Sequence, residues 1–160
     1  MRVATIGVYG FTADSFLAAL READVELVAD VRQRRGVRGS EYAWANSKRL
    51  QAMLAEARIG YRHHPELAPT TELRRLQYAE DDRHGVGKRN RAELAPEYAR
   101  RYLTEILDRV DLGAFATAGL GEGNATALMC VERDPPACHR SLIAGRLAAE
   151  HGARIEHLLP

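Results

Sequence analysis

The chain has 160 residues, and its 23 Lys and Arg nearly balance its 22 Asp and Glu. This length suits a single domain with its own hydrophobic core, and the near-neutral charge gives no overall field that would favour nucleic acid or a membrane surface. No segment reaches the roughly 20 consecutive apolar residues of a membrane span. No export signal is recognised, and two cysteines are too few for a disulfide framework. We therefore expect a soluble cytoplasmic domain with reduced thiols.

The first part of the chain predicts a β-α-β unit followed by a second helix and strand. Residues 3–8 and 25–31 are apolar, β-branched runs typical of buried strands. Residues 12–22 between them begin with a capping residue and continue with apolar residues at helical spacing. Such a unit joins parallel strands by a right-handed crossover. A loop with glycines, a helix around residues 50–54 and a weaker strand at residues 59–63 follow.

The middle of the chain combines a long polar stretch with a regular helix. Residues 69–91 are mostly polar and charged, and we expect a mobile excursion with no more than a short helical turn. Pro96 then starts a helix whose apolar residues recur at spacings of three and four up to Val110. A glycine-rich connection over residues 119–124 leads into the next strand.

The segment after this connection changes character within a few positions. An apolar strand at residues 127–131 ends at Glu132, two prolines prevent its continuation, and a helix over residues 138–151 opens with Cys-His-Arg. A last strand is expected at residues 154–158. Alternating strands and helices predict one three-layer α/β domain over residues 1–160, with a mostly parallel central sheet of about five strands.

Two carboxylates follow strands at the edge where open α/β sheets bind their ligands. Asp30 ends one expected strand and Glu132 ends another, so both should emerge beside the opening of the C-terminal helix. We therefore take Asp30 and Glu132 as candidate acid–base groups, with His139 to orient a ligand or move a proton. Structural ion pairs are the alternative explanation for both carboxylates.

Cys138 is a candidate nucleophile, because a thiol near a helix N-terminus beside His139 and Arg140 has a lowered pKa. The alternative is a small buried residue that closes the turn. A metal site made of Cys130, Cys138 and His139 is disfavoured, because the cysteine spacing matches no common zinc motif and adjacent Cys and His side chains are poorly placed to share an ion. A redox role for Cys130 and Cys138 is disfavoured together with the metal site. We expect no metal and no cofactor.

Two basic stretches stand out against the near-neutral total charge. One follows Asp30 and the other spans residues 83–91. Guanidinium groups match oxyanions in geometry, which favours phosphate binding. The alternative is an ordinary solvated surface, and neither stretch has a recognisable nucleic-acid motif. The candidate anion-binding residues are Arg32, Arg34, Arg35 and Arg140.

Several segments resemble one protein family. They are T-I-G-V-Y-G from Thr5, L-V-A-D-V-R from Leu27, I-G-Y-R-H-H-P-E-L from Ile59, M-C-V-E-R-D-P-P-A-C-H-R from Met129 and the final I-E-H-L. Over nearly its whole length the chain resembles the family called domain of unknown function 488. Ala68 and Pro69 stand where that family usually has glycine. The resemblance implies an α/β fold and a site built from Asp30, Arg32, Glu132, Cys138, His139 and Arg140. It implies no particular reaction.

Two functions from different classes remain open. The first is an enzyme, a hydrolase or transferase, that acts on a phosphorylated or nucleotide-like anion held by Arg32, Arg140 and the helix N-terminus. The second is a non-catalytic module that binds nucleotides or nucleic acid through its arginine-rich loops, with an affinity that falls steeply with salt. The expected partner is a small anionic ligand, nucleic acid is an alternative partner, and the oligomeric state is open.

Overall fold

The computed structural model describes residues 1–118 and 125–160. Five strands form one sheet in the order β3-β2-β4-β1-β5, and every pair of neighbours is parallel. This confirms the predicted α/β sheet. The glycine-rich connection predicted over residues 119–124 lies outside the described residues. The strands are β1 (Arg2–Ile6), β2 (Val25–Asp30), β3 (Gly60–His63), β4 (Ala125–Met129) and β5 (Arg154–Leu158).

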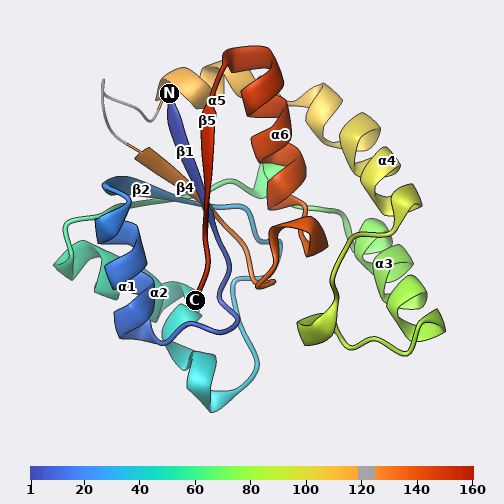
Figure 1. Ribbon diagram of the computed structural model, residues 1–160, viewed down its shortest axis with the longest axis horizontal. Helices are drawn as coiled ribbons and strands as arrows, with labels where there is room; N and C mark the ends of the chain where they lie inside the picture. The colour runs from blue at the N-terminus through green and yellow to red at the C-terminus, as the bar shows by residue number, and fades with distance from the viewer. Residues whose placement is uncertain (119–124) are drawn as a thin grey trace.

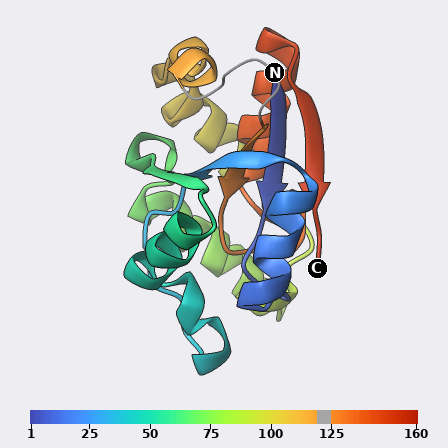
Figure 2. The same ribbon diagram turned by 90° about the vertical axis from the view of Figure 1, so that its left-hand side faces the viewer.

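Helices cover both faces of the sheet and complete three layers. Helices α1 (Ala13–Glu22) and α2 (Ser47–Glu56) lie on one side in Figure 1, whereas α3 (Thr71–Arg83), α4 (Pro96–Glu105) and α6 (Arg140–His151) lie on the other. Figure 2 shows the same layers from the side. After β2 the chain crosses to one face of the sheet, and after β4 it crosses to the other face. This divergence opens a crevice at the carboxyl ends of the two strands. None of the described helices is long and apolar enough to cross a membrane.

Burial explains which strands were easy to recognise. All five residues of the central strand β4 are buried, because helices cover both of its faces. Its apolar sequence is therefore continuous rather than alternating. The edge strand β3 alternates between exposed and half-buried residues, so its apolar signal is weaker.

Capping residues define two helix ends as the sequence predicts. At the start of α1, Thr12 Oγ1 accepts a hydrogen bond from the Ser15 amide at 3.1 Å, and Ser15 Oγ accepts one from the Thr12 amide at 3.0 Å. This reciprocal pair is a capping box. Helix α6 ends at Gly152, whose φ of 64° lies in the left-handed region that glycine adopts most easily.

The structure corrects the prediction of an irregular excursion over residues 69–91. Most of that stretch forms the 13-residue helix α3, which Thr70 caps by accepting a hydrogen bond from the Leu73 amide at 3.2 Å. Its buried face carries Leu73 but also Gln77 and Asp81. Gln77 accepts a hydrogen bond from the Ala95 amide at 2.8 Å and donates one to Asp81 at 2.9 Å. Hydrophobic spacing missed the helix because two of its three buried residues are polar.

The helix predicted to extend from Pro96 to Val110 is shorter in the structure. Helix α4 ends at Glu105, a 3-10 turn follows at Leu107–Arg109, and a further short helix, α5 (Leu112–Ala118), was not predicted. Leu107 is buried, and Val110 packs against the core from a half-buried position. The apolar spacing therefore continues past the point where the backbone leaves the α-helix.

A glycine after β1 lets two segments approach closely beside the crevice. A Cβ atom on Gly7 would lie 1.9 Å from the carbonyl oxygen of Glu132. That oxygen belongs to main chain rather than to a flexible side chain, so the contact cannot be relieved by a rotamer change. The close packing of residue 7 against residue 132 therefore requires glycine.

We expect Gly7→Ala to lower the free energy of unfolding by at least about 2 kcal/mol, because it overpacks two backbone segments. Gly145→Ala is the matched control. Gly145 is exposed in α6, and its added Cβ would meet nothing within 4 Å, so this change should stabilise the helix by about 0.5–1 kcal/mol. Urea unfolding of both variants measures the difference, and equal stabilities would contradict the packing argument.

Candidate functional site

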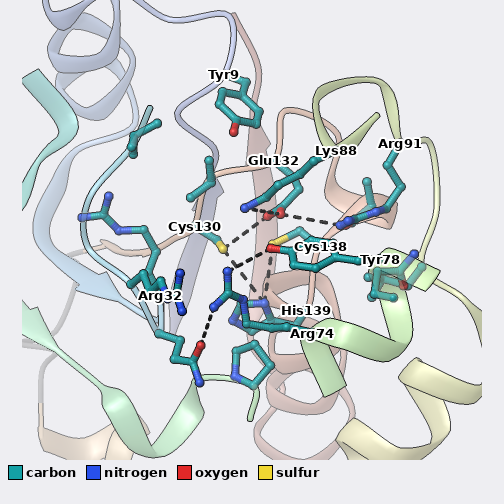
Figure 3. A pocket seen from close by; sticks show the side chains of 18 of the residues that line it. Tyr9, Arg32, Arg74, Tyr78, Lys88, Arg91, Cys130, Glu132, Cys138 and His139 are labelled. Atoms are coloured by element: carbon teal, nitrogen blue, oxygen red, sulfur yellow. Dashed lines mark hydrogen bonds and ion pairs between the residues drawn. The ribbon is translucent and has the colours of Figure 1, made fainter. Parts of the chain in front are cut away.

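A cavity of about 430 Å³ lies at the carboxyl ends of β2 and β4. Its walls come from the loop after β2, from α3 and the segment that follows it, and from the turn between β4 and α6 (Figure 3). The cavity also contains the side chains of Cys130, Glu132, Cys138 and His139. Cationic side chains dominate its polar lining. They are Arg32, Arg34, Arg38, Arg74, Lys88 and Arg91.

The main chain, rather than a carboxylate, orients His139 in this cavity. Its Nε2 lies 3.0 Å from the carbonyl oxygen of Val31, and because a carbonyl only accepts, Nε2 carries the hydrogen and donates it. The other ring nitrogen, Nδ1, lies 3.8 Å from Cys138 Sγ and 4.0 Å from Cys130 Sγ. The Tyr102 ring packs on the imidazole with centroids 5.3 Å apart. The basic nitrogen of His139 is therefore held facing two thiols.

The turn between β4 and α6 places Cys138 and His139 side by side. Pro135–Ala137 forms a 3-10 turn, after which Cys138 has extended backbone with φ −138° and ψ 142°. His139 is the N-cap of α6, so the helix begins at Arg140 and not at Cys138 as predicted. Because the backbone changes conformation between the two residues, both side chains reach the floor of the cavity.

This turn also corrects the geometric argument made against a shared ion. Cys130 Sγ, Cys138 Sγ and His139 Nδ1 all lie within 4.8 Å of one another. The prediction that adjacent Cys and His side chains are poorly placed to bind together is therefore wrong. It assumed a continuous helix, in which neighbouring side chains diverge.

Charges around the two thiols separate their pKa values. Burial opposes ionisation of Cys138, but the hydrogen bond from Cys130 and the positive charges of His139 and Arg140 lower the pKa of its thiol well below the usual range. The hydrogen bond to Cys138, together with burial, raises the pKa of Cys130. Burial also opposes protonation of His139, yet the charge of Cys138 raises the pKa of its imidazole. The favoured state is a Cys138 thiolate beside a His139 imidazolium.

Glu132 adds a buried carboxyl group to the same cluster. Burial, followed by the negative charge of Cys138, raises its pKa, while Lys88 opposes the shift. One oxygen, Oε1, lies 3.7 Å from Lys88 Nζ and 3.6 Å from Arg91 Nη1. The other, Oε2, lies 3.3 Å from Cys130 Sγ. Glu132 thus connects the thiols to the cationic wall.

Asp30 and Arg32 form a buried pair at the back of the site. Arg32 Nε and Nη2 donate to the two Asp30 oxygens at 2.9 and 2.7 Å, and Arg32 Nη1 donates to the Ala45 carbonyl at 2.9 Å. Tyr61 donates a further hydrogen bond to Asp30 at 2.7 Å. Both side chains of the pair are at most 1% exposed. The structure therefore places Asp30 in a structural ion pair, the alternative considered for it above.

The remaining predicted anion-binding residues lie in different places. Arg140 is fully buried, and it donates to the carbonyl oxygens of Glu132 at 2.6 Å and Arg133 at 2.8 Å. It supports the turn and does not line the cavity. Arg35 lies beside the Tyr61 hydroxyl at 3.5 Å, also outside the cavity. Arg34, by contrast, has an exposed side chain on the cavity wall.

Four cations of the cavity, Arg38, Arg74, Lys88 and Arg91, were not among the predicted site residues. Arg74 comes from α3, where Gln33 and Tyr78 accept hydrogen bonds from it at 2.6 and 2.9 Å. Lys88 and Arg91 follow that helix, in the second basic stretch. Arg74 and Tyr78 are four positions apart, so they are neighbours on a helix. Because the sequence analysis did not predict a helix here, this pair could not be recognised.

Comparison with known proteins identifies a family. A family model described as "Domain of unknown function DUF488" matches residues 12–147. The chain belongs to this family. No curated protein and no solved structure matches the chain. The DUF488 match begins after β1 and covers α1, β2, the cationic loops and the Cys-His-Arg turn.

The buried pair at the back of the DUF488 site should control stability. We expect Asp30→Asn to lower the free energy of unfolding by about 3–5 kcal/mol, because it leaves the Arg32 charge buried without a carboxylate. Asp24→Asn removes the partner of Arg2 in a pair whose side chains are 78% and 41% exposed, and should cost less than about 1 kcal/mol. Urea unfolding of both variants tests this; a small effect of Asp30→Asn would show that the pair is dispensable.

The two thiols should differ in reactivity with pH. Iodoacetamide reacts with the thiolate, so Cys138 should remain reactive well below the ordinary thiol pKa of about 8.5. Its alkylation rate should fall only as the pH drops through the lowered pKa of Cys138. Peptide mass spectrometry over a pH series measures the rate, with Cys130 as the internal control because its pKa is raised. A Cys138 profile centred on the ordinary thiol pKa would contradict the ion pair.

Proposed function

We propose that this DUF488 protein is an enzyme that acts on a small phosphorylated or nucleotide-like anion, with Cys138 as its nucleophile. The observation that carries the proposal is the position of Cys138 Sγ, 3.8 Å from His139 Nδ1 in a cationic cavity. An imidazole fixed beside a thiol activates the cysteine for covalent catalysis. The cavity cations supply the contacts that an anionic substrate needs.

Arg34 and Arg38 are the best candidates to hold the substrate. Their side chains are exposed on the cavity wall, and neither guanidinium has a hydrogen-bond partner among the described residues. Lys88 offers a further positive charge deeper in the cavity, next to Glu132. The other cations are engaged in internal bonds. In this proposal Arg32 and Arg140 therefore support the site, and Arg34, Arg38 and Lys88 bind the anion.

The proposed reaction starts with attack by the Cys138 thiolate on the phosphorus or carbon atom that carries the leaving group. The bond from sulfur forms with a sulfur lone pair, and the bond to the leaving group breaks with its electron pair. The leaving group takes a proton from His139 Nδ1. Glu132 then removes a proton from water or an acceptor hydroxyl, which attacks the covalent intermediate and releases Cys138.

A non-catalytic binding module would use the same arginines. It would leave unexplained why a buried imidazole is bonded to the Val31 carbonyl and turned toward two thiols. Both sulfur atoms and this imidazole line the cavity rather than the hydrophobic core alone. This arrangement favours the enzyme over the module.

The test is turnover of a panel of nucleotides and phosphorylated metabolites, followed by ³¹P NMR and mass spectrometry in the presence of a chelator. We expect Cys138→Ser to lower kcat/KM by at least about 10³-fold and Glu132→Gln by about 10²–10⁴-fold. Substrate binding by both variants should change little, as calorimetry would show. Unchanged turnover in Cys138→Ser, or binding with no turnover of any compound, would overturn the proposal.

The anion preference can be tested without knowing the substrate. Iodoacetate carries a negative charge and iodoacetamide does not. The cavity cations should therefore make the ratio of the iodoacetate rate to the iodoacetamide rate higher at Cys138 than for free glutathione. We expect Arg34→Ala with Arg38→Ala to lower the iodoacetate rate by about 10-fold or more at low salt, and to leave the iodoacetamide rate unchanged. Arg21→Ala, an exposed change on α1, is the control. An equal loss with both reagents would contradict anion binding.

A further inference from the structure

We infer that Cys130, Cys138, His139 and Glu132 form a binding site for a soft divalent metal ion, with Zn²⁺ as the first candidate. Figure 3 shows these four side chains converging at the floor of the cavity. The two sulfur atoms and His139 Nδ1 lie within 4.8 Å of one another, and Glu132 Oε2 lies 3.3 Å from Cys130 Sγ. This inference rests on the positions of the four groups and not on the catalytic role proposed above.

The distances from His139 Nδ1 to the two sulfur atoms are close to those between three ligands of a tetrahedral zinc site. Zinc bonds of about 2.3 Å to sulfur and about 2.0–2.1 Å to nitrogen or oxygen place a sulfur and a nitrogen ligand about 3.5 Å apart. The observed distances from His139 Nδ1 are 3.8 Å to Cys138 Sγ and 4.0 Å to Cys130 Sγ. Shifts of a few tenths of an ångström would bring Nδ1 and the two sulfur atoms to coordination distance. No rearrangement of the turn is required.

The surroundings orient His139 and Glu132 as a metal site requires. Imidazoles that bind metal through one nitrogen usually donate the other N–H to a carbonyl or carboxylate. His139 already donates Nε2–H to Val31, which leaves Nδ1 for the ion. Lys88 and Arg91 lie near Oε1 of Glu132, which leaves Oε2 on the side of the thiols. These outer contacts leave Nδ1 of His139 and Oε2 of Glu132 as the atoms available to the ion.

The donor set also selects the class of metal. Two thiolates and an imidazole favour soft or borderline ions such as Zn²⁺, whereas Mg²⁺ and Ca²⁺ need oxygen ligands. The cations near Glu132 balance part of the negative charge that two thiolates and a carboxylate bring. The ion would enter through the cavity, because all four ligands line it.

Metal binding and the proposed reaction would exclude each other. A coordinated Cys138 sulfur shares with the ion the electron pair that nucleophilic attack requires. Zn²⁺ would therefore switch the proposed enzyme off, and removal of the ion would restore the free thiolate. The metal site would thus be a control on Cys138.

The test is metal stoichiometry of the full chain, purified under reducing conditions, stripped with a chelator and reloaded with Zn²⁺ or Co²⁺. We expect one ion per chain by mass spectrometry of the metal, and a thiolate-to-cobalt charge-transfer band with the intense d–d bands of a tetrahedral Co²⁺ site. Loss of an outer-shell partner weakens metal binding by about 10- to 100-fold. Cys130→Ser, Cys138→Ser and His139→Gln each remove a ligand and should weaken binding by more than that. His151→Gln, exposed at the end of α6, is the control and should change nothing.

A second measurement uses the wild-type chain and does not depend on the folding of variants. Zn²⁺ should slow alkylation of Cys138 by iodoacetamide at least about 10-fold, as bound thiolates lose nucleophilicity, and a chelator should restore the rate. The inference would be overturned by clearly less than one bound ion per chain. It would also be overturned if Cys130→Ser changed neither the metal affinity nor the effect of Zn²⁺ on alkylation of Cys138. Turnover is assayed in chelator and metal binding without substrate, so failure of one proposal is distinguishable from failure of the other.

Discussion

The turn between β4 and α6 depends on a buried guanidinium. Arg140 is fully buried and donates to the main-chain carbonyls of Glu132 and Arg133, and it makes no ion pair with a carboxylate among the described residues. A buried charge without a compensating anion is costly. Part of the compensation comes from Cys138, because the Arg140 charge is one of the causes that lower the pKa of that thiol. The same cation therefore fixes the shape of the turn and favours its thiolate, so fold and chemistry are coupled.

A second polar network determines where the cationic wall lies. Arg91 Nε donates to both oxygens of Asp81 at 2.9 and 3.0 Å, and Gln77 connects Asp81 to the amide of Ala95. These bonds attach the segment after α3 to the helix itself. Lys88, only three positions before Arg91, is thereby held over Glu132. The polar inner face of α3 thus serves to position charge, which explains why it carries fewer apolar residues than a typical core-facing helix.

The parts of this protein that could be predicted from sequence are those governed by local rules. The central strand β4 was recognisable because its two buried faces make the sequence continuously apolar, and the strand-end rule then located Glu132 near Cys138 and His139. Helix α3 was missed because the polar group Asp81 is satisfied by Arg91, a partner outside the helix. Sequence gives no sign of whether an arginine binds a ligand or the main chain. Burial decides that question, and burial depends on the complete fold.

The bond between His139 and Val31 has a consequence for how its contribution can be tested by mutation. The acceptor is a backbone carbonyl, so a residue at position 31 that leaves the backbone just after β2 in place preserves it. In catalytic sites where a side chain orients the imidazole, replacing that side chain reveals its role. Here the group that fixes Nε2 is main chain, so no side-chain substitution removes that acceptor directly. Only a change to the backbone itself, such as an ester in place of the peptide that contains this carbonyl, would weaken the acceptor and uncover the contribution.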